Sequence, residues 1–305
     1  MRQFATGITL TVLAALLTAG AVSAQSQRTI EKVLFEDGHI RFVEVTNWPG
    51  ENHADAILYS SIVMADAAWP AVREAPAEAT ASRPESHSDN VLPRDNRPYP
   101  WCRAQSPVAA RTVTVKGDFP QHYYRIDYKR IDGKEFGAHW KTWYGDVFGP
   151  PAKVVADPGK TLQSATPFSK DWPYNIGYSA TVSAPANHTL RYEDDHIQLL
   201  EVAIREGEKE NMHGHPYPSV YADDGGFAPE GAVYKNATLE PSDGPPWGKM
   251  TTAPQGANFP ICFSAVPEAP HEVSVEKGPP QHFYRIHFKR VDGAAIKENW
   301  RAWYP

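Results

Sequence analysis

Cysteine is scarce in this chain, with two residues among 305. Two cysteines 160 positions apart exclude a Cys-His zinc module, which needs closely spaced ligands. Positive charge is not in excess either, because the formal net charge is −6. Basic residues are dispersed apart from Lys129-Arg130 and Lys289-Arg290, so the sequence indicates no nucleic-acid surface. A nucleophile elbow, a Walker loop and a dinucleotide fingerprint are also missing.

A long hydrophobic run is missing as well. The apolar stretch from Ile8 to Leu17 is shorter than the roughly 20 residues that a membrane-spanning helix needs. It follows Arg2 and precedes the small residues Val22-Ser23-Ala24, an order typical of a secretory signal peptide. We expect residues 1–24 to be removed, leaving a secreted or periplasmic chain without a membrane span.

What the sequence does contain is an internal duplication. Residues 36–50 align without a gap on residues 193–207, and residues 120–133 align on residues 280–293. The duplication predicts two domains, at 28–145 and 185–305. Between them, residues 146–184 are rich in proline turns and are predicted to form a connector.

Alternating hydrophobicity is the main structural signal in both copies. In residues 271–275, His271, Val273 and Val275 share one face of a predicted strand. Short strands, frequent turns and few convincing helices predict an all-β barrel or sandwich in each copy. Long irregular segments are expected at 67–100 and 224–260, and the aromatic segment 139–144 is expected to form one helical turn.

A cluster of three histidines is predicted in the second copy and has no counterpart in the first. His213 and His215 are two positions apart, so on a strand both point to one face. His271 lies on the apolar face of a later strand, where an unpaired imidazole is costly to bury. Three converging imidazoles suit a divalent transition metal such as Fe, Zn, Mn, Ni or Cu. The site would serve a small-molecule ligand.

The first copy has other residues at the aligned positions. The repeat shifts set Ala56 and Leu58 opposite His213 and His215, and Arg111 opposite His271. Any metal chemistry is therefore expected in the C-terminal copy. Arg111 suggests an anion pocket, or else a structural ion pair or a strand bent toward solvent, and we favour the last two over the pocket.

At this point the sequence resembles the cupin superfamily. Gly207, His213 and His215 have the spacing of the first cupin motif, Gly226 falls at its closing glycine, and residues 267–273 resemble the second motif. The resemblance implies two cupin-like β-barrel (double-stranded β-helix) domains related by internal duplication. It also implies a bicupin whose N-terminal copy is degenerate, and a metal near the mouth of the second barrel.

The sequence departs from the cupin pattern at the carboxylate. The family's glutamate is expected three or four residues after the second histidine, where this chain has Ser219 and Val220. A site of three histidines resembles that of thiol dioxygenases within the superfamily. Glu208 and Glu210 precede the histidines near a turn and are expected to face solvent.

Two tyrosines continue the parity of the histidine strand. The hydroxyl of Tyr217 or Tyr221 could position a substrate or a proton beside the metal, or the rings could simply pack in the core, which we favour. The repeat shift also places Cys102 on Cys262. These cysteines could form a disulfide near a pseudo-twofold axis, but we expect two separately buried thiols.

Three kinds of function remain open. The first is a metal-dependent enzyme of the oxygenase, isomerase or lyase type that acts on a small polar metabolite. The second is a non-catalytic protein that binds a small molecule or a metal, and the third is a structural envelope protein. A homodimer is possible in each case.

Overall fold

The computed structural model describes residues 29–48, 50, 52–65, 73–74, 100–115, 121–130, 136–145, 172, 174–225, 234–238, 260–265 and 267–289. These residues form sixteen strands and three short helices. None of the described helices is long and apolar enough to cross a membrane. The predicted signal peptide lies outside the described residues.

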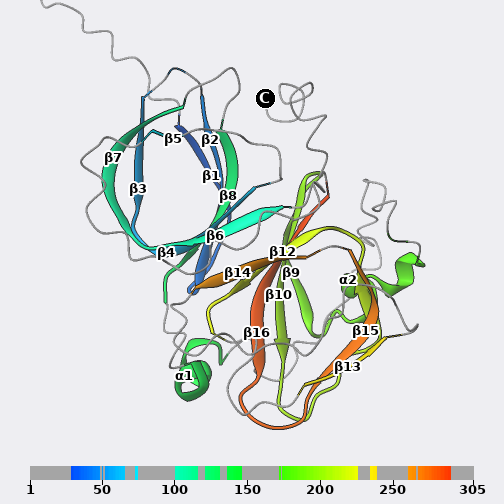
Figure 1. Cartoon of the computed structure of the whole chain (residues 1–305). Coiled ribbons are helices and arrows are strands. Elements are labelled where there is room, and N and C mark those ends of the chain that lie inside the picture. Colours follow the sequence, from blue (N-terminus) through cyan, green and yellow to red (C-terminus); the bar gives the residue numbers. More distant parts are fainter. Residues whose placement is uncertain are drawn as a thin grey trace, which may run out of the picture.

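The first copy folds into two antiparallel sheets (Figure 1). The strand order is β1-β2-β8-β4-β6 in the larger sheet and β3-β7-β5 in the smaller one. The strands are β1 Thr29–Glu36, β2 Ile40–Asn47, β3 Asn52–Ile57, β4 Ser60–Ala65, β5 Arg73–Glu74, β6 Trp101–Gln105, β7 Val108–Val115 and β8 Gln121–Tyr128.

The second copy repeats this arrangement. Its larger sheet has the order β9-β10-β16-β12-β14 and its smaller sheet the order β11-β15-β13. The strands are β9 His188–Glu193, β10 Ile197–Ile204, β11 His213–His215, β12 Ser219–Asp223, β13 Tyr234–Thr238, β14 Ile261–Ala265, β15 Glu268–Val275 and β16 Gln281–Phe288.

The two copies share one topology and one register. Each strand of the second copy occupies the place of the strand eight numbers lower in the first. Ile40 pairs with Tyr128 as Ile197 pairs with Phe288, in agreement with the aligned sequence segments. Two facing sheets with this order form a jelly roll, the architecture that cupins share. The predicted fold class, all-β with two duplicated barrels, is confirmed.

The predicted irregular segments contain more structure than expected. Strand β5 lies within 67–100 and pairs with β7, and strand β13 lies within 224–260 and pairs with β15. Helix α1, Phe136–Trp143, confirms the helix predicted from the aromatic segment 139–144. The sequence missed β5 and β13 because their partners are far away along the chain.

The largest apolar cluster joins the two copies. It takes residues from the larger sheet of each copy, on the face that looks away from that copy's own barrel interior. Its buried members are Ile40, Phe42, Ile62, Met64, Cys102, Tyr124, Ile126, Tyr128, Ile197, Leu199, Val220, Ala222, Cys262, Tyr284, Ile286 and Phe288. Each strand of these sheets therefore has one face in the shared core and one in a barrel.

The cysteine prediction is wrong. Cys102 in β6 and Cys262 in β14 form a disulfide, with their Cα atoms 6.2 Å apart. Figure 1 shows β6 and β14 side by side where the two copies meet. Equivalent positions of a duplicated fold meet at its pseudo-twofold axis, so the two thiols share one core instead of lying in separate ones.

The described part of the connector packs against the second barrel. It contains the 3-10 helix η2, Ile176–Tyr178, and the short helix α2, Ala180–Ser183. The indole Nε1 of Trp172 donates a hydrogen bond to the backbone oxygen of Glu268 at 2.7 Å. Ser179 forms an isolated bridge with Gly214. These contacts brace the two strands that carry the site histidines.

Candidate metal centre

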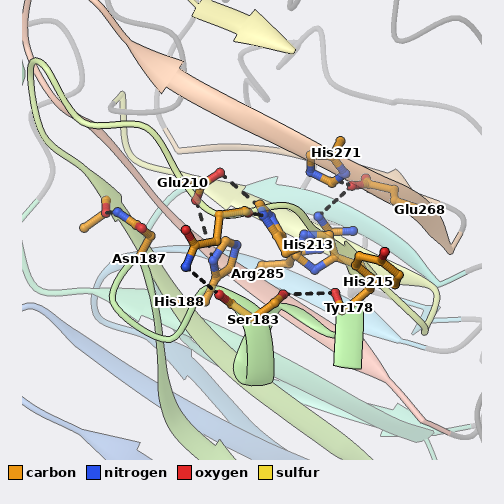
Figure 2. A network of polar contacts seen from close by, with 12 residues as sticks. Tyr178, Ser183, Asn187, His188, Glu210, His213, His215, Glu268, His271 and Arg285 are labelled. Carbon is orange, nitrogen blue, oxygen red and sulfur yellow. Dashed lines mark hydrogen bonds and ion pairs between the residues drawn. The ribbon is translucent and has the colours of Figure 1, made fainter. Parts of the chain in front are cut away.

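The three predicted histidines come together between β11 and β15. His213 lies opposite His271 in the register of these antiparallel strands. The ring centroids are 4.5 Å apart for His213 and His271, 5.1 Å for His213 and His215, and 5.5 Å for His215 and His271. The side chains of His213 and His215 are almost fully buried, whereas that of His271 is 16% exposed. The predicted convergence is therefore present (Figure 2).

Glycine between the two histidines allows this close approach. A Cβ atom at Gly214 would lie 2.8 Å from the backbone oxygen of Glu268 and 3.1 Å from the nitrogen of Pro270. Real Cβ atoms do not tolerate such a distance to backbone atoms. The small residue therefore sets the spacing of β11 and β15, and with it the distance between their histidines.

Sequence reasoning missed two possible ligands. His188 begins β9, and Glu268 begins β15 opposite His215. Two overlapping sets have ligand atoms within 4.8 Å of one another: His188, His213 and His215, and His215, Glu268 and His271. The predicted trio is thus divided between the sets, with His215 in both. The sequence did contain a signal for His188. The repeat shift aligns it with Glu31, so, like the three predicted histidines, it has no histidine counterpart in the first copy.

Hydrogen bonds prepare the imidazoles for metal binding. The Nδ1 atoms of His213 and His271 lie 2.9 Å from the backbone oxygens of Asn211 and Ala269. A carbonyl only accepts, so each Nδ1 carries the proton and each Nε2 keeps its lone pair. Metal-bound histidines usually have this second hydrogen bond, which fixes the tautomer and the ring orientation.

His215 is oriented by a chain of side chains. Its Nδ1 lies 3.1 Å from Nε2 of His287, whose Nδ1 lies 2.7 Å from Oε1 of Gln198. The Gln198 oxygen accepts, so His287 holds its proton on Nδ1 and His215 donates to its Nε2. This order leaves Nε2 of His215 with a free lone pair, like those of His213 and His271.

Burial keeps the imidazoles of His188, His213 and His215 neutral. It lowers the pKa of His213 to about 3, with a further contribution from His271. Burial, and then the charge of Arg285, also hold the pKa of His215 well below its ordinary value. Burial, and then the effects of His213 and Arg285, do the same to the pKa of His188. Neutral imidazole is the form that binds metals, so the site is ready for a cation at neutral pH.

The site also contains a carboxylate, which corrects the expectation that none is present. Glu268 is 6% exposed and accepts hydrogen bonds from Tyr221 at 2.7 Å and from Arg285 at 3.0 Å. Burial would raise the pKa of Glu268, but Arg285, His271 and these hydrogen bonds lower it. This carboxylate lies on β15, the strand that also carries His271. The position expected for the carboxylate is occupied by Ser219, whose hydroxyl accepts a hydrogen bond from Nε of Arg285.

Glu210 does not face solvent, contrary to the prediction. It is 2% exposed and lies 3.5 Å from Nδ1 of His188 and 3.8 Å from Nε2 of His213. Burial raises its pKa well above the ordinary value. The prediction failed because Glu210 accompanies β15, where its backbone nitrogen donates to Val273 at 2.9 Å. Glu208 is half-buried and pairs with Arg205 at 2.9 Å.

The two predicted tyrosines are both buried but differ in their contacts. The hydroxyl of Tyr221 bonds Glu268 and Arg285, and its ring stacks on Phe263 at 4.5 Å. The ring of Tyr217 lies 6.0 Å from that of His287. Tyr221 therefore combines core packing with a polar contact in the site.

The first copy has other residues at the positions that correspond to the three histidines. By register, Asp55 and Ile57 correspond to His213 and His215, one position away from the predicted Ala56 and Leu58, because the second copy has one more residue between the aligned start segments and this strand. Asp55 lies opposite Arg111 in that register, and their side chains lie outside the described ones. Among described side chains, both ligand sets belong to the second copy.

Solved structures provide the comparison with known proteins, since no family model and no curated protein matches the chain. A cupin 2 conserved barrel domain protein from Leptotrichia buccalis aligns over 88% of this chain and 92% of its own, at 8% identity and a TM-score of 0.23. An oxalate decarboxylase variant from Bacillus subtilis aligns over 87% and 76%, at 11% identity and 0.23. AerE from Microcystis aeruginosa aligns over 85% and 97%, at 8% identity and 0.23.

Likeness at these TM-scores carries no functional argument. The strand order of both copies, together with motif histidines that converge inside one barrel, is what decides the fold. It is the cupin fold. The second barrel of this fold holds the candidate metal centre, and the first holds ion pairs, such as Arg125 with Asp127, in the corresponding place.

The residues of the candidate site fit a transition metal. Four imidazoles and one carboxylate are nitrogen and oxygen donors of the kind that such ions take. Nδ1 of His188 is buried without a hydrogen-bond partner among the described residues, which is costly for a polar atom. A metal ion bound through Nδ1 of His188 would give this buried nitrogen a partner.

Proposed function

We propose that the chain is an exported, metal-dependent enzyme of the cupin type. It would act on a small polar metabolite in the C-terminal barrel by oxygenation, isomerisation or lyase chemistry. The observation that carries the proposal is the set of three imidazoles, two buried and one partly exposed, whose Nδ1 atoms are all engaged and whose Nε2 lone pairs remain free. A structural core has no need of three histidines prepared in this way.

Individual residues have distinct parts in this proposal. His213, His215 and His271 would hold the metal, with His188 and Glu268 within reach as further ligands. When bound, such an ion supplies Lewis acidity or binds oxygen at neutral pH. Tyr221 would orient the substrate through its hydroxyl, which the neighbouring Glu268 and Arg285 hold in place. Burial of the site excludes bulk water from the reaction.

Export is supported by two independent features. The first 24 residues have the charge, apolar stretch and small residues of a cleaved signal. The disulfide between Cys102 and Cys262 suits an oxidising compartment, because thiols in the cytosol are kept reduced. A secreted or periplasmic location follows from this proposal and is checked by cell fractionation with a C-terminal tag.

Metal analysis tests the proposal directly. We expect purified wild-type protein to carry about one equivalent of a transition metal by mass spectrometry, and His213→Ala and His271→Ala to lose most of it. Arg111→Ala, the register counterpart of His271 in the first copy, is the matched control and should keep the metal. Wild-type protein that takes up no metal, even after incubation with each candidate ion, contradicts the proposal.

A non-catalytic binding protein is the second candidate. It is favoured by the closure of the site, because His213, His215 and Glu268 are all almost fully buried. Oxygen uptake and product formation with thiols and small organic acids would distinguish the two. A metal-loaded protein that binds members of this panel without turning any of them over is a binding protein.

A further inference from the structure

An arginine lies buried beside the candidate ligands. Arg285 in β16 is 1% exposed. Its Nε donates to Ser219 at 3.1 Å, and its Nη1 donates to Glu268 at 3.0 Å and to the Tyr221 hydroxyl at 2.5 Å. Nη2 is buried and has no hydrogen-bond partner among the described residues. The guanidinium therefore presents two N–H groups that the fold does not use, and leaving them unpaired is costly.

The first copy shows how the same arginine is satisfied when no ligand is needed. Arg125 occupies the corresponding place in β8. Its Nε and Nη2 donate to both oxygens of Asp127, at 2.5 and 2.9 Å, and Nη2 also donates to Glu31 at 3.1 Å. Duplication thus preserves the arginine, but only the first copy supplies carboxylates to its Nη2.

Both of those carboxylates are histidines in the second copy. His287 stands at the place of Asp127, and His188 at the place of Glu31. His287 is engaged with His215 and Gln198, so it has no acceptor to offer Arg285. The exchange that creates the imidazole cluster is therefore the same exchange that leaves Nη2 of Arg285 unpaired.

The charges of the occupied site also call for an anion. A divalent metal and Arg285 together carry three positive charges. Glu268 and Glu210 offset at most two of them, and the neutral imidazoles offset none. A net positive charge inside a barrel lined by Val202, Phe283 and Ala265 is strongly disfavoured without a counter-charge. An anionic ligand would complete the balance.

The guanidinium is held in a defined orientation. Its Cζ lies 4.4 Å from the centre of the Tyr221 ring, which limits rotation of the guanidinium plane. A planar, fixed fork of N–H groups matches the planar oxygens of a carboxylate. Figure 2 shows Arg285 among His188, His213 and Glu268, so an anion at Nη2 would lie at the candidate metal centre.

We propose that Nη2 of Arg285 binds the carboxylate of a small organic acid, which is the substrate class of this site. That the bound acid is a substrate rests on the proposed function, whereas binding of the carboxylate can be measured without turnover. Acids that carry one carboxylate and few further atoms fit a site whose side chains are buried apart from that of His271, which is 16% exposed.

Calorimetric titration of the full mature chain tests the inference. Glycolate and acetate are compared with their neutral counterparts glycolamide and acetamide, and with inorganic phosphate. We expect the carboxylates to bind at least roughly tenfold more tightly than the amides and than phosphate. Arg285→Gln should weaken carboxylate binding by roughly tenfold to a hundredfold, and Arg285→Lys by less.

Arg125→Gln is the matched control, since Arg125 is the same arginine with its partners supplied, and it should bind carboxylates like the wild type. Circular dichroism and metal content are measured for every variant. If Arg285→Gln does not fold, Arg285→Lys and the comparison of acids with amides still decide. Equal affinity for acids and amides, tighter binding of phosphate, or unchanged carboxylate binding in the folded Arg285 variants would overturn the inference. Failure of the proposed function is seen separately, as absence of metal.

Discussion

At the scale of single residues, the two copies differ by exchanges between charged groups and imidazoles. In the first copy Asp127 pairs with Arg125, and Arg41 approaches Asp127 at 3.8 Å. In the second copy the same places hold His287 and Gln198, which form the chain that orients His215. In the first barrel these charged side chains neutralise one another as ion pairs. In the second barrel the same places hold neutral groups that support the binding of a cation.

His287 is expected to act on the metal through His215. His287→Ala removes the acceptor of the His215 Nδ1 proton, so the ring loses its fixed tautomer and orientation. We predict a fall in metal affinity of about tenfold to a hundredfold. Competition with a chromogenic chelator measures it, and His139→Ala, an exposed histidine of α1, is the control. Unchanged affinity in folded His287→Ala would show that the chain of hydrogen bonds does not support the metal.

The buried histidine His282 should make the free energy of unfolding depend on pH. Burial alone would lower the pKa of His282. The carboxylate of Asp224, 3.7 Å from its Nδ1, and that of Glu201, which lies 2.8 Å from its Nε2, raise this pKa to about 9. The pKa of Glu201 is lowered to about 2, because His282 and Arg191 outweigh the effect of burial. The His282 contribution is complete below about pH 6.5 and is lost as the pH rises towards 9. The Glu201 contribution is present above about pH 4.5 and is lost towards pH 2.

We therefore expect the free energy of unfolding to fall by on the order of 1–3 kcal/mol between pH 6 and 9.5 because of His282. Urea denaturation at both pH values measures it, and His282→Gln should remove most of the difference. His122, the counterpart in the first copy, has a lowered pKa because the effect of burial outweighs the hydrogen bond and the charge of Glu44. His122→Gln is therefore the control and should keep the pH dependence. If the wild type and His282→Gln show the same pH dependence, His282 and its carboxylate partners are not the source of it.

At the scale of elements, the site depends on the spacing of β11 and β15. These strands carry His213, His215, Glu268 and His271, and Trp172 and Ser179 brace them from the connector. The alternation of the second-copy strands was readable in the sequence, as was the inward direction of their histidines. The pairing of β11 with β15 was not, because strand register depends on contacts between segments more than 50 residues apart.

Gly214→Ala should separate these strands. The added methyl group meets the backbone of Glu268 at 2.8 Å, and backbone cannot move aside as a flexible side chain can. We predict a loss of stability of about 1–3 kcal/mol and a clear fall in bound metal. Denaturant unfolding and metal analysis check both effects. Gly38→Ala is the control, since nothing lies within 4 Å of its added methyl group. Normal metal content in Gly214→Ala would mean that the strand spacing is not critical.

At the scale of the whole molecule, the two barrels are joined by a shared apolar core and one disulfide. This core makes the first copy a support for the larger sheet of the second, which contributes β16 and β10 to the site. Tyr144, which directly follows helix α1, reaches into the second copy and donates a hydrogen bond to Asp224. Loss of the ligands in the first copy therefore does not make that copy dispensable.

The disulfide should contribute to the stability of the pair of barrels. It closes a loop of 160 residues, which restricts the unfolded chain. We predict that the double variant Cys102→Ser, Cys262→Ser loses about 2–5 kcal/mol of unfolding free energy. Reduction of the wild type should have a similar effect and should leave the double variant unchanged. Wild-type stability that does not respond to complete reduction contradicts the prediction.

The sequence by itself determined the duplication, the all-β class and the three convergent histidines, because repeats and strand periodicity are local properties of the chain. Only the tertiary structure added His188, Glu210, Glu268 and Arg285 to the site and joined Cys102 to Cys262. These residues come from strands and turns that meet only when the sheets pair and the copies pack. Whether a carboxylate faces water or a histidine, and whether an arginine keeps its partner, is decided by burial and register, which no short segment of sequence contains.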